Sequence, residues 1–332
     1  MPALIAAPDA ATLEHAVTLL RAGGLVAFPT ETVYGLGADA RNADAVRRIF
    51  AAKERPADHP VIVHLQDASA MVAWARDIPP AAQKLAEAFW PGPLTLILNR
   101  AAAVSDVVTG GQPTVGLRVP AHPVAQLLLR AFGGGIAAPS ANRFGRISPT
   151  AAQHVMDDIG DRLELIVDGG ACALGIESTI IACSNETAVL LRPGAIDIEA
   201  LTRVLGTPPE MGGKDLPRAP GTLAAHYAPR IRSRLLDSRA MLRLLHEQAT
   251  RRFGVLARTQ RQPADFSGCW IDAPDDPAAY AHDLYASLRT LESAAIDMIV
   301  IEDVPHDERW RAVRDRVTRA THDVSSPVDE LD

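Results

Sequence analysis

The feature that most constrains the fold of this chain is a repeated alternation of short apolar runs with amphipathic stretches. Apolar runs occur at 25–28, 61–65, 94–98, 115–119 and 135–138, and helical periodicity occurs at 9–22, 42–53, 79–90 and 122–132. Strands that alternate with helices indicate an α/β fold. Three further apolar runs (163–167, 178–182 and 188–191) have no helical pattern between them, which favours a mixed sheet. Helical patterns flank this group at 150–159 and 197–205.

Residues 206–230 interrupt the pattern with repeated prolines and glycines and no periodicity, which is typical of a segment between domains. Beyond it, apolar runs at 233–236, 253–257 and 297–301 alternate with helical patterns at 238–250, 277–294 and 308–321. We therefore predict a large mixed-sheet domain over 1–205, a linker over 206–230 and a smaller α/β domain over 231–332.

Charge and cysteine content argue against several classes of protein. Residues 1–230 carry 19 basic and 22 acidic side chains, and the remainder carries 14 and 18. Neither part is therefore a basic domain that binds nucleic acid through its phosphates. Three widely spaced cysteines predict neither a disulfide framework nor a cysteine zinc site. The start lacks a signal-peptide pattern and no apolar stretch reaches about 18–20 residues, so we expect a cytoplasmic protein without membrane contact.

The segment 28–40 (FPTETVYGLGADA) matches a dinucleotide-binding fingerprint in its glycine spacing. Its glycines stand too far beyond the preceding apolar run to form a strand-to-helix turn, which argues against a nicotinamide dinucleotide site. We therefore favour a glycine-containing loop, in which Thr30, Glu31 and Thr32 suit polar contacts with a small molecule.

Two basic positions carry weaker signals. Only three of the 33 basic residues are lysines, and Lys53 ends a predicted helix in the sequence KERP. A compact ammonium group there weakly indicates phosphate binding, although helix termination alone explains a basic residue before proline. His64 lies in an apolar run, where a histidine is more often a satisfied core residue than a ligand. Its spacing from His59 does not suggest zinc.

Polar residues beside apolar runs are stronger candidates. Arg118 cannot be buried without an anion, so it needs either a carboxylate side chain or a bound acid. Ser140 and Asn142 follow a strand end whose small residues allow a ligand to approach the backbone. Ser148 and Thr150 precede a predicted helix, where they either cap the helix or favour an anion at its N-terminus.

Eight ordered motifs together resemble the YrdC-like threonylcarbamoyl-AMP synthases. They are PTETVYGLG (29–37), KERP (53–56), PGPLT (91–95), VGLRVP (115–120), APSAN (138–142), SPT (148–150), ESTI (177–180) and RPG (192–194). The segment APGTLAAHYAP (219–229) is similar to the linker of the long, two-domain branch of that family. The resemblance covers nearly the whole chain. It implies a large twisted mixed-sheet YrdC-like domain around a positively lined cavity, followed by a smaller Rossmann-like α/β domain.

The resemblance also implies an activity. L-threonine, bicarbonate and ATP would give threonylcarbamoyl-AMP and pyrophosphate, with Mg²⁺ on the ATP phosphates and no covalent enzyme intermediate. The product would pass to a tRNA threonylcarbamoyl transferase complex, which makes the threonylcarbamoyladenosine at tRNA position 37. The chain itself would bind tRNA weakly or not at all.

Carried over motif by motif, the resemblance implies roles for particular residues. Threonine would lie against Thr32, His64, Arg118, Ser140 and Ser178, with Arg118 pairing its carboxylate. ATP would lie against Lys53, Arg55, His59, Thr114, Asn142, Ser148, Thr150, Arg192 and Tyr227. Lys53 and Arg55 would be the catalytic groups, because cations on the phosphates stabilise the charge of the transition state. Tyr227 would reach in from the linker, which would act as a lid.

Two residues depart from the family pattern. His59 stands where an asparagine is usual, and Phe144 replaces a small polar residue.

Two other functions are compatible with parts of the sequence. An RNA-binding translation or ribosome-maturation factor without synthase activity is the main alternative, but it would prefer a basic surface with interleaved aromatic residues. This chain has a net charge of −7 and 5% aromatic residues. A carbamoyltransferase of the hydrogenase-maturation type would need zinc-finger cysteines, which the sequence lacks.

Overall fold

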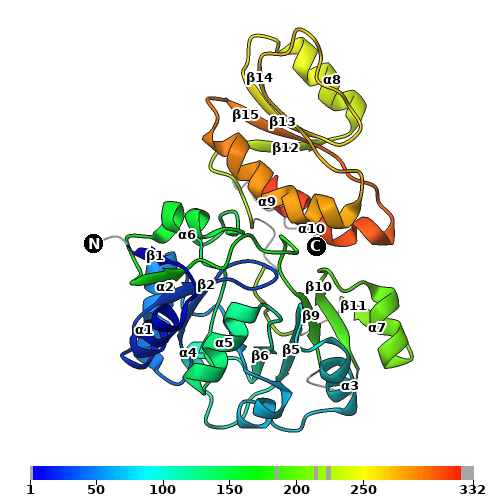
Figure 1. The fold of residues 1–332 in the computed structure, drawn as a ribbon. Coiled ribbons are helices and arrows are strands. Elements are labelled where there is room, and N and C mark those ends of the chain that lie inside the picture. Colours follow the sequence, from blue (N-terminus) through cyan, green and yellow to red (C-terminus); the bar gives the residue numbers. More distant parts are fainter. Residues whose placement is uncertain (1–2, 184–186, 213–215, 222–225, 323–332) are drawn as a thin grey trace. The chain divides into compact units, whose positions relative to one another are not determined.

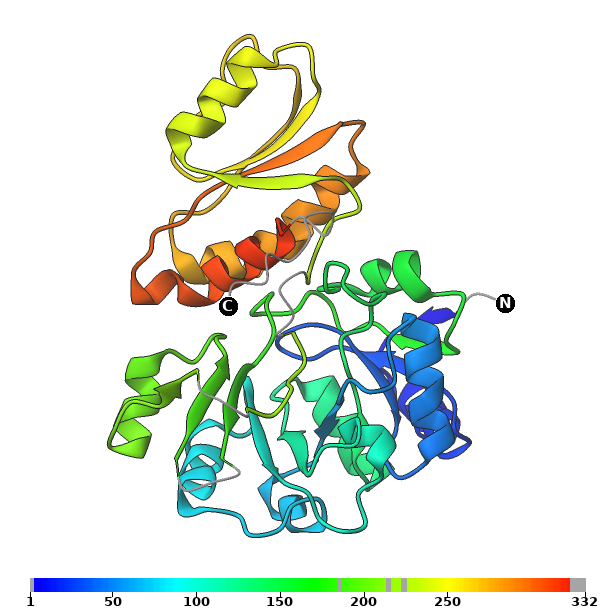
Figure 2. The same cartoon turned by 180° about the vertical axis from the view of Figure 1, so that it is seen from behind.

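The computed structural model describes residues 3–183, 187–212, 216–221 and 226–322, which form two compact units (Figure 1, Figure 2). The first unit comprises the described residues up to Phe144 and those from Ser148 to Gly221. The second comprises Gly145–Ile147 and the described residues from His226 onward. Each unit has its own sheet.

The first unit is built on a mixed sheet, which confirms the predicted fold class. In the described part of the chain the strand order is β1-β8-β2-β3-β7-β4-β6-β5-β9-β10-β11. The strands are β1 (Leu4–Ala6), β2 (Val26–Phe28), β3 (Gly35–Asp39), β4 (Ile62–His64), β5 (Leu94–Asn99), β6 (Thr114–Arg118), β7 (Ile136–Ala137), β8 (Leu165–Val167), β9 (Thr179–Ala182), β10 (Val189–Arg192) and β11 (Glu210–Met211). Parallel pairs such as β4 with β6 occur beside antiparallel pairs such as β5 with β6.

Six helices of the first unit lie where the periodicity predicts them. They are α1 (Ala10–Arg21), α2 (Ala43–Lys53), α3 (Pro80–Phe89), α5 (Pro123–Phe132), α6 (Ala152–Ile159) and α7 (Ile198–Leu205). The short α4 (Asp106–Thr109) and the 3₁₀ helix η1 (Ala68–Ala73) were not predicted. The Asn42 side chain caps α2 by accepting hydrogen bonds from the amides of Asp44 and Ala45, which fixes where the helix begins.

The prediction of a loop over 28–40 is wrong for the second half of this segment. Residues 35–39 form β3, which pairs antiparallel with β2 and β7. A Cβ atom on Gly37 would lie 2.8 Å from Cε1 of Phe28, so this glycine allows close strand packing. The glycines of the fingerprint therefore lie in a strand and form no phosphate-binding turn, which excludes the dinucleotide fingerprint.

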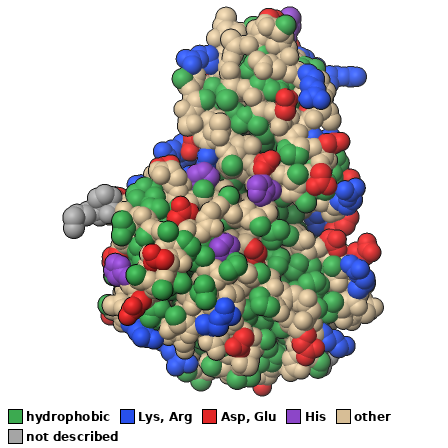
Figure 3. Space-filling model, in the orientation of Figure 1, with side chains coloured by type: hydrophobic (Ala, Val, Ile, Leu, Met, Phe, Trp, Pro, Cys, Tyr) green, Lys and Arg blue, Asp and Glu red, His purple; other side chains and the backbone are tan. Residues whose placement is uncertain are grey.

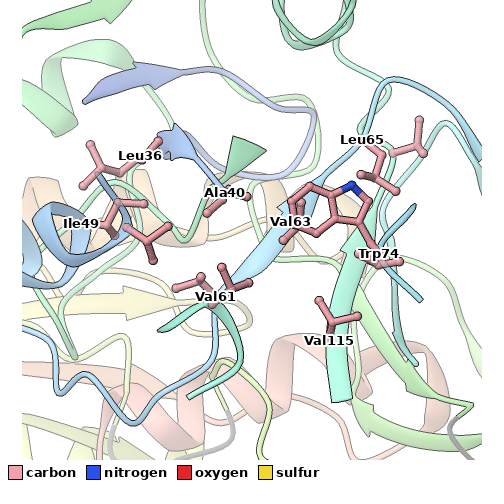
Figure 4. Packing of buried hydrophobic residues seen from close by; sticks show 14 of the residues in the cluster. Leu36, Ala40, Ile49, Val61, Val63, Leu65, Trp74 and Val115 are labelled. Carbon is pink, nitrogen blue, oxygen red and sulfur yellow. The ribbon is translucent and has the colours of Figure 1, made fainter. Parts of the chain in front are cut away.

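Two apolar clusters cover the two faces of this sheet. Helices α1 and α5 pack on one face, where Val26 and Phe28 of β2 lie. Ala27 belongs to the cluster on the other face. Val63 and Trp74 of the same cluster are labelled in Figure 4. This alternation follows from the period of two in a strand, and it leaves the loops at the strand ends free to carry polar side chains.

The second unit has the α/β architecture that the sequence predicted, built on a parallel sheet that includes one strand, at 268–272, that was not predicted. The strands β12 (Ser233–Leu236), β13 (Phe253–Ala257), β14 (Gly268–Asp272) and β15 (Met298–Glu302) take the order β12-β15-β13-β14 in the described residues. Its helices are α8 (Ser238–Glu247), α9 (Pro277–Ser293), η2 (Glu308–Trp310) and α10 (Arg311–Ala320). The helix predicted over 308–321 is thus a 3₁₀ turn followed by α10.

The proline- and glycine-rich segment is shared between the units. The Arg218 amide donates to Oε1 of Gln112 at 2.7 Å, and the Arg218 side chain forms an ion pair with Asp58. The segment around Arg218 therefore packs on the first unit. The Ala228 amide donates to the carbonyl of Gly145 at 2.8 Å within the second unit. Among the described residues, none of the helices has the length and apolarity to cross a membrane.

Candidate functional site

Three loops of the first unit are joined by backbone hydrogen bonds. The Tyr34 amide donates to the carbonyl of Pro149 at 2.8 Å, and the Ala141 amide donates to the carbonyl of Tyr34 at 2.9 Å. The loops after β2, after β7 and before α6 therefore lie together. They carry Thr32, which is fully buried, and its hydroxyl lies 2.8 Å from that of Thr30.

Lys53 fixes one of these loops from the end of α2. Its Nζ donates to the carbonyl of Ser140 at 2.5 Å and to the carbonyl of Asn142. The side chain is buried, and burial followed by the charge of Arg55 holds its pKa well below the usual value, although Asp158 acts in the opposite direction. No carboxylate forms a salt bridge with Lys53 among the described residues. The partners of this ammonium group are therefore neutral carbonyl oxygens, without an anionic group in salt-bridge contact.

Arg55 lies beside the two residues that depart from the family pattern. Its Nη2 donates to the carbonyl of Pro60 at 2.7 Å, and its guanidinium lies 5.7 Å from the centre of the Phe144 ring. The His59 ring meets the same Phe144 ring edge-on at 5.2 Å. The two departures are thus neighbours, and together with Arg55 they form one aromatic and cationic group. Burial and the charge of Arg55 lower the pKa of His59.

A second polar network joins the loop before α6 to β9 and β10. The Ser148 hydroxyl donates to Oε1 of Glu177 at 2.6 Å. Arg192 donates through Nη2 to the carbonyl and the hydroxyl oxygen of Ser178, at 2.9 and 3.1 Å. The Ser178 hydroxyl also lies 2.8 Å from that of Thr95. All of these side chains are buried, and the structure brings Ser148, Ser178 and Arg192 close together.

Arg118 has a carboxylate partner from the chain itself. Its Nη2 lies 2.8 Å from Oε1 of Glu31, and both side chains are buried. Burial raises the pKa of Glu31, but the charge and hydrogen bond of Arg118 outweigh it, so the net pKa is lowered. Of the two anions that the sequence left open, the structure therefore supplies the side-chain carboxylate. The bound acid that the resemblance implied stays a prediction.

His64 is paired with Arg118 in register on the neighbouring strand. Its ring is buried, and burial followed by the charge of Arg118 lowers its pKa well below the usual value, so it is neutral. No hydrogen-bond partner of its Nδ1 is found in the part of the chain that the structure describes. A buried ring nitrogen without a partner is costly, which argues that His64 is more than a core residue.

The remaining predicted residues are less closely connected. Thr114 and Arg118 lie at opposite ends of β6. The Thr150 amide contacts Nδ1 of His154 at 3.2 Å at the start of α6. Tyr227 lies in the second unit, where the Arg316 guanidinium is 5.1 Å from its ring centre, and its φ of 62° is in the left-handed region. Tyr227 therefore remains a predicted ATP contact.

Sequence reasoning missed the partners of these residues. Glu31 was expected to contact a small molecule but not Arg118, and Glu177 was not assigned to the site. The signal for Glu31 was available, because a buried arginine requires an acid and Glu31 lies in a segment of mostly apolar and small polar residues. In the described residues, no group of three or more His, Cys, Asp or Glu side chains could hold a metal ion.

Two family profiles match consecutive parts of the chain. A family described as "Telomere recombination" matches residues 18–194, and one described as "Threonylcarbamoyl-AMP synthase, C-terminal domain" matches residues 196–321. The boundary between the two matches, at residues 194–196, precedes the predicted start of the linker at residue 206.

Curated and solved proteins match over nearly the whole length. The threonylcarbamoyl-AMP synthase of Bacillus subtilis is 40% identical over 321 residues, which cover 93% of this chain and 92% of the relative. That of Pyrococcus abyssi is 40% identical over 319 residues, covering 92% and 93%. The solved P. abyssi Sua5 complexed with L-threonine has a TM-score of 0.86 at 35% identity, covering 96% of this chain and 97% of that one. A variant of the same Sua5 with a histidine and a tyrosine replaced by alanine has a TM-score of 0.87 at 34% identity, covering 96% of each chain.

Proposed function

Because this chain belongs to the threonylcarbamoyl-AMP synthase family, we propose that it joins L-threonine, bicarbonate and ATP into threonylcarbamoyl-AMP and releases pyrophosphate. It is a nucleotidyltransferase of tRNA modification. This function rests on the sequence identity of 40% between this chain, over both units, and curated synthases. The fold also matches that of a Sua5 protein that was solved in complex with L-threonine.

The proposed chemistry needs cations at the phosphates of ATP. The threonine amine attacks the carbon of bicarbonate and water leaves, which gives a carbamate. A carbamate oxygen then bonds to the α-phosphorus of ATP while the bond from that phosphorus to the bridging oxygen of pyrophosphate breaks. Lys53 and Arg55 are our catalytic candidates, because fixed positive charge stabilises the negative charge that develops on phosphate. The lack of a carboxylate partner for Lys53 in the described residues supports this assignment. Asn142, Ser148 and Thr150 lie on the joined loops, and Arg192 lies at the end of β10, where it contacts Ser178. All four are proposed to position the nucleotide.

Threonine is proposed to bind beside Arg118 and His64. The Nε and Nη2 atoms of Arg118 bind Gly92 and Glu31, and no partner of its Nη1 is found in the described residues, so Nη1 can take the threonine carboxylate. The neutral His64 can form a hydrogen bond through its unpartnered Nδ1, as donor or acceptor according to its tautomer. Thr32, Ser140 and Ser178 would supply hydroxyl contacts.

Mg²⁺ is proposed to arrive with ATP. No cluster of acidic side chains in the described residues suits a resident ion, and Mg²⁺ usually binds through substrate phosphates and water. When bound, it would neutralise phosphate charge beside Lys53 and Arg55. The chain itself would hold ATP through its cations and loop hydroxyls.

The product is proposed to pass to a tRNA threonylcarbamoyl transferase complex, without strong binding of tRNA by this chain. On the face of the molecule shown in Figure 3, basic and acidic side chains are interspersed. A protein that holds RNA through its phosphates would need a basic surface. The alternative of an RNA-binding factor without synthase activity is not supported by the relatives, which are named as synthases.

Tyr227 and the segment around it are proposed to shield the reacting groups from water. Tyr227 is held in the second unit by Arg316 and by Tyr285, whose ring lies at 5.7 Å. Replacement of Tyr227 by alanine should reduce threonine-dependent pyrophosphate release while the first unit stays folded. Unchanged turnover would refute this role.

The proposed function is tested by incubating the full chain with ATP and bicarbonate and measuring pyrophosphate release with each of several amino acids. Release that depends on both threonine and bicarbonate, with threonylcarbamoyl-AMP detected by mass spectrometry, is expected. A replacement of threonine by serine or valine shows which part of the side chain is recognised. No release with any amino acid would contradict the proposal.

A further inference from the structure

The first unit contains a cavity of about 340 Å³ that none of the proposed site residues lines. It lies where β3 ends at Asp39, where β4 is followed by Leu65, and where α5 ends before three glycines. Trp74, which follows η1, forms part of its wall, and Figure 4 shows its indole ring beside Leu65. The volume is within the range of about 300–1,000 Å³ that is usual for small-molecule sites.

Two arginines line this cavity without an acidic partner. Arg41 places its guanidinium 5.7 Å from the centre of the Trp74 ring, and no acceptor of that guanidinium is found in the described residues. Arg21 donates through Nη2 to the carbonyls of Ala131 and Phe132, at 3.2 and 3.4 Å, but forms no ion pair in the described part of the chain. Many other arginines of this chain do pair with carboxylates, for example Arg47 with Asp44.

Uncharged donors converge on the same cavity. Trp74 is only 4% exposed, yet no acceptor of its indole N–H is found among the described residues. Buried tryptophans usually bind a partner through this group. Gly134 and Gly135 also line the cavity, and their backbone amides have no acceptor in the described residues. Asp39 is the one acidic group among the lining residues, and it accepts a hydrogen bond from the Arg41 amide at 2.9 Å.

Arg21 and Arg41 are exposed, and they share this concave surface with N–H groups that have no acceptor in the described residues. An anion bound there would meet positive charge and hydrogen-bond donors together. We propose that this cavity is a second binding site, separate from the synthase site, for a small anionic metabolite that carries a phosphate or carboxylate group. Arg41 and the Trp74 indole N–H would bind the anion. Arg21 and the glycine amides would complete its ligand shell, and Phe132 would contact its apolar part.

The test follows the indole N–H of Trp74 by ¹H–¹⁵N NMR in the full chain. The chain has four tryptophans, and Trp74→Phe assigns the resonance of interest. Pyrophosphate, AMP and citrate are titrated separately, with sodium chloride at the same ionic strength as the reference. A saturable shift of the Trp74 resonance with at least one anion is expected. Pyrophosphate or AMP alone would identify a phosphate site, and citrate alone would identify a carboxylate site.

Matched variants separate a site from general attraction of charge. Arg41→Gln should raise the Kd of the bound anion by about tenfold or more, because it removes a charge-assisted hydrogen bond. Arg76→Gln is the control, because Arg76 is exposed and does not line the cavity. This substitution removes one positive charge from the same unit. An equal effect of both variants would overturn the proposal. So would the absence of a saturable Trp74 shift with all three anions up to about 20 mM.

This proposal does not depend on the synthase reaction. Loss of pyrophosphate release in a Lys53 variant should leave the Trp74 titration unchanged, since Lys53 does not line the cavity. A Trp74 shift that disappears in Lys53→Met would instead place the anion at the synthase site and overturn the second site.

Discussion

Lys53 in the first unit and Glu302 in the second are both buried at the end of a regular element, but their charges are satisfied in opposite ways. Glu302 accepts hydrogen bonds from the Ser238 hydroxyl at 2.6 Å and from the amides of Arg258 and Thr259 at 2.6 and 2.8 Å. Burial raises its pKa, but these donors outweigh burial and the net pKa is lowered. Lys53 has carbonyl acceptors and no carboxylate within salt-bridge distance in the described residues.

The comparison separates a structural charge from one that is available to a ligand. A carboxylate surrounded by donors is complete within the fold, whereas a buried ammonium without an anion gains most when a negative ligand arrives. The same division holds more widely. Of the buried polar and charged side chains in the described residues, only His226, Glu302 and Arg316 belong to the second unit. The polar interior of the first unit is therefore the place where ligand chemistry is expected.

The largest expected effect is that of Lys53→Met on catalysis. Pyrophosphate release should fall by about 10²–10³-fold, because a fixed cation at the reacting phosphate is lost. The carbonyls of Ser140 and Asn142 lose this donor in the variant, so folding is verified by circular dichroism before activities are compared. Lys84→Met, at an exposed position of α3, should keep wild-type activity. Wild-type turnover by the Lys53 variant would show that Lys53 is not a charge that acts on a ligand.

Glu302→Ala should act on stability. It leaves several buried donors without an acceptor, so the free energy of unfolding of the second unit should fall by about 3 kcal/mol. Urea unfolding can be followed through Trp270 and Trp310, which report on the second unit, in variants whose other two tryptophans are replaced by phenylalanine. Glu247→Ala at an exposed position of α8 is the control. An unchanged unfolding midpoint would show that Glu302 is not a structural charge.

Arg118→Lys should mainly affect threonine binding. Lysine lacks the planar fork that can hold Glu31 and a ligand carboxylate at once. The KM for threonine should therefore rise by about tenfold, while the KM for ATP changes by about twofold or less. Steady-state kinetics with each substrate varied in turn measure the difference. Equal changes in both KM values would show that Arg118 serves only the ion pair with Glu31.

The smallest expected effect is the pH dependence due to His64. Its pKa is lowered in the folded state, so below the ordinary value of 6.5 the unfolded chain binds a proton that the folded chain does not. Stability should therefore be full above that pH and fall on acidification, by up to about 1.4 kcal/mol per pH unit. His64→Gln should reduce this slope in thermal or urea unfolding. His59 and His122, whose pKa values are also lowered, maintain part of it.

The control for this prediction is His15→Gln, at an exposed position of α1. That variant should retain the wild-type pH dependence. A wild-type slope in His64→Gln would mean that the His64 ring is hydrated in the folded protein.

The sequence by itself determined the fold class, because apolar period and turn residues are local properties of the chain. Helices such as α1 and α5 and strands such as β5 begin and end within a residue or two of the predicted positions. Strand β3 was missed, since its glycines and alanine carry none of the side chains that usually mark a strand. Its pairing depends on close approach to Phe28, which no local pattern reveals.

The candidate residues of the site were also named from the sequence, but their partners in the fold were not. Arg118 required an anion on physical grounds alone, yet Glu31 is 87 positions away and only the folded sheet brings the two together. Lys53 and Ser140 are likewise 87 positions apart, and Ser148 and Glu177 are 29 positions apart. The sequence shows which positions carry charged or hydroxyl side chains that suit a ligand. The partner of each buried charge follows from strand order and loop packing, and these were decided by the tertiary structure.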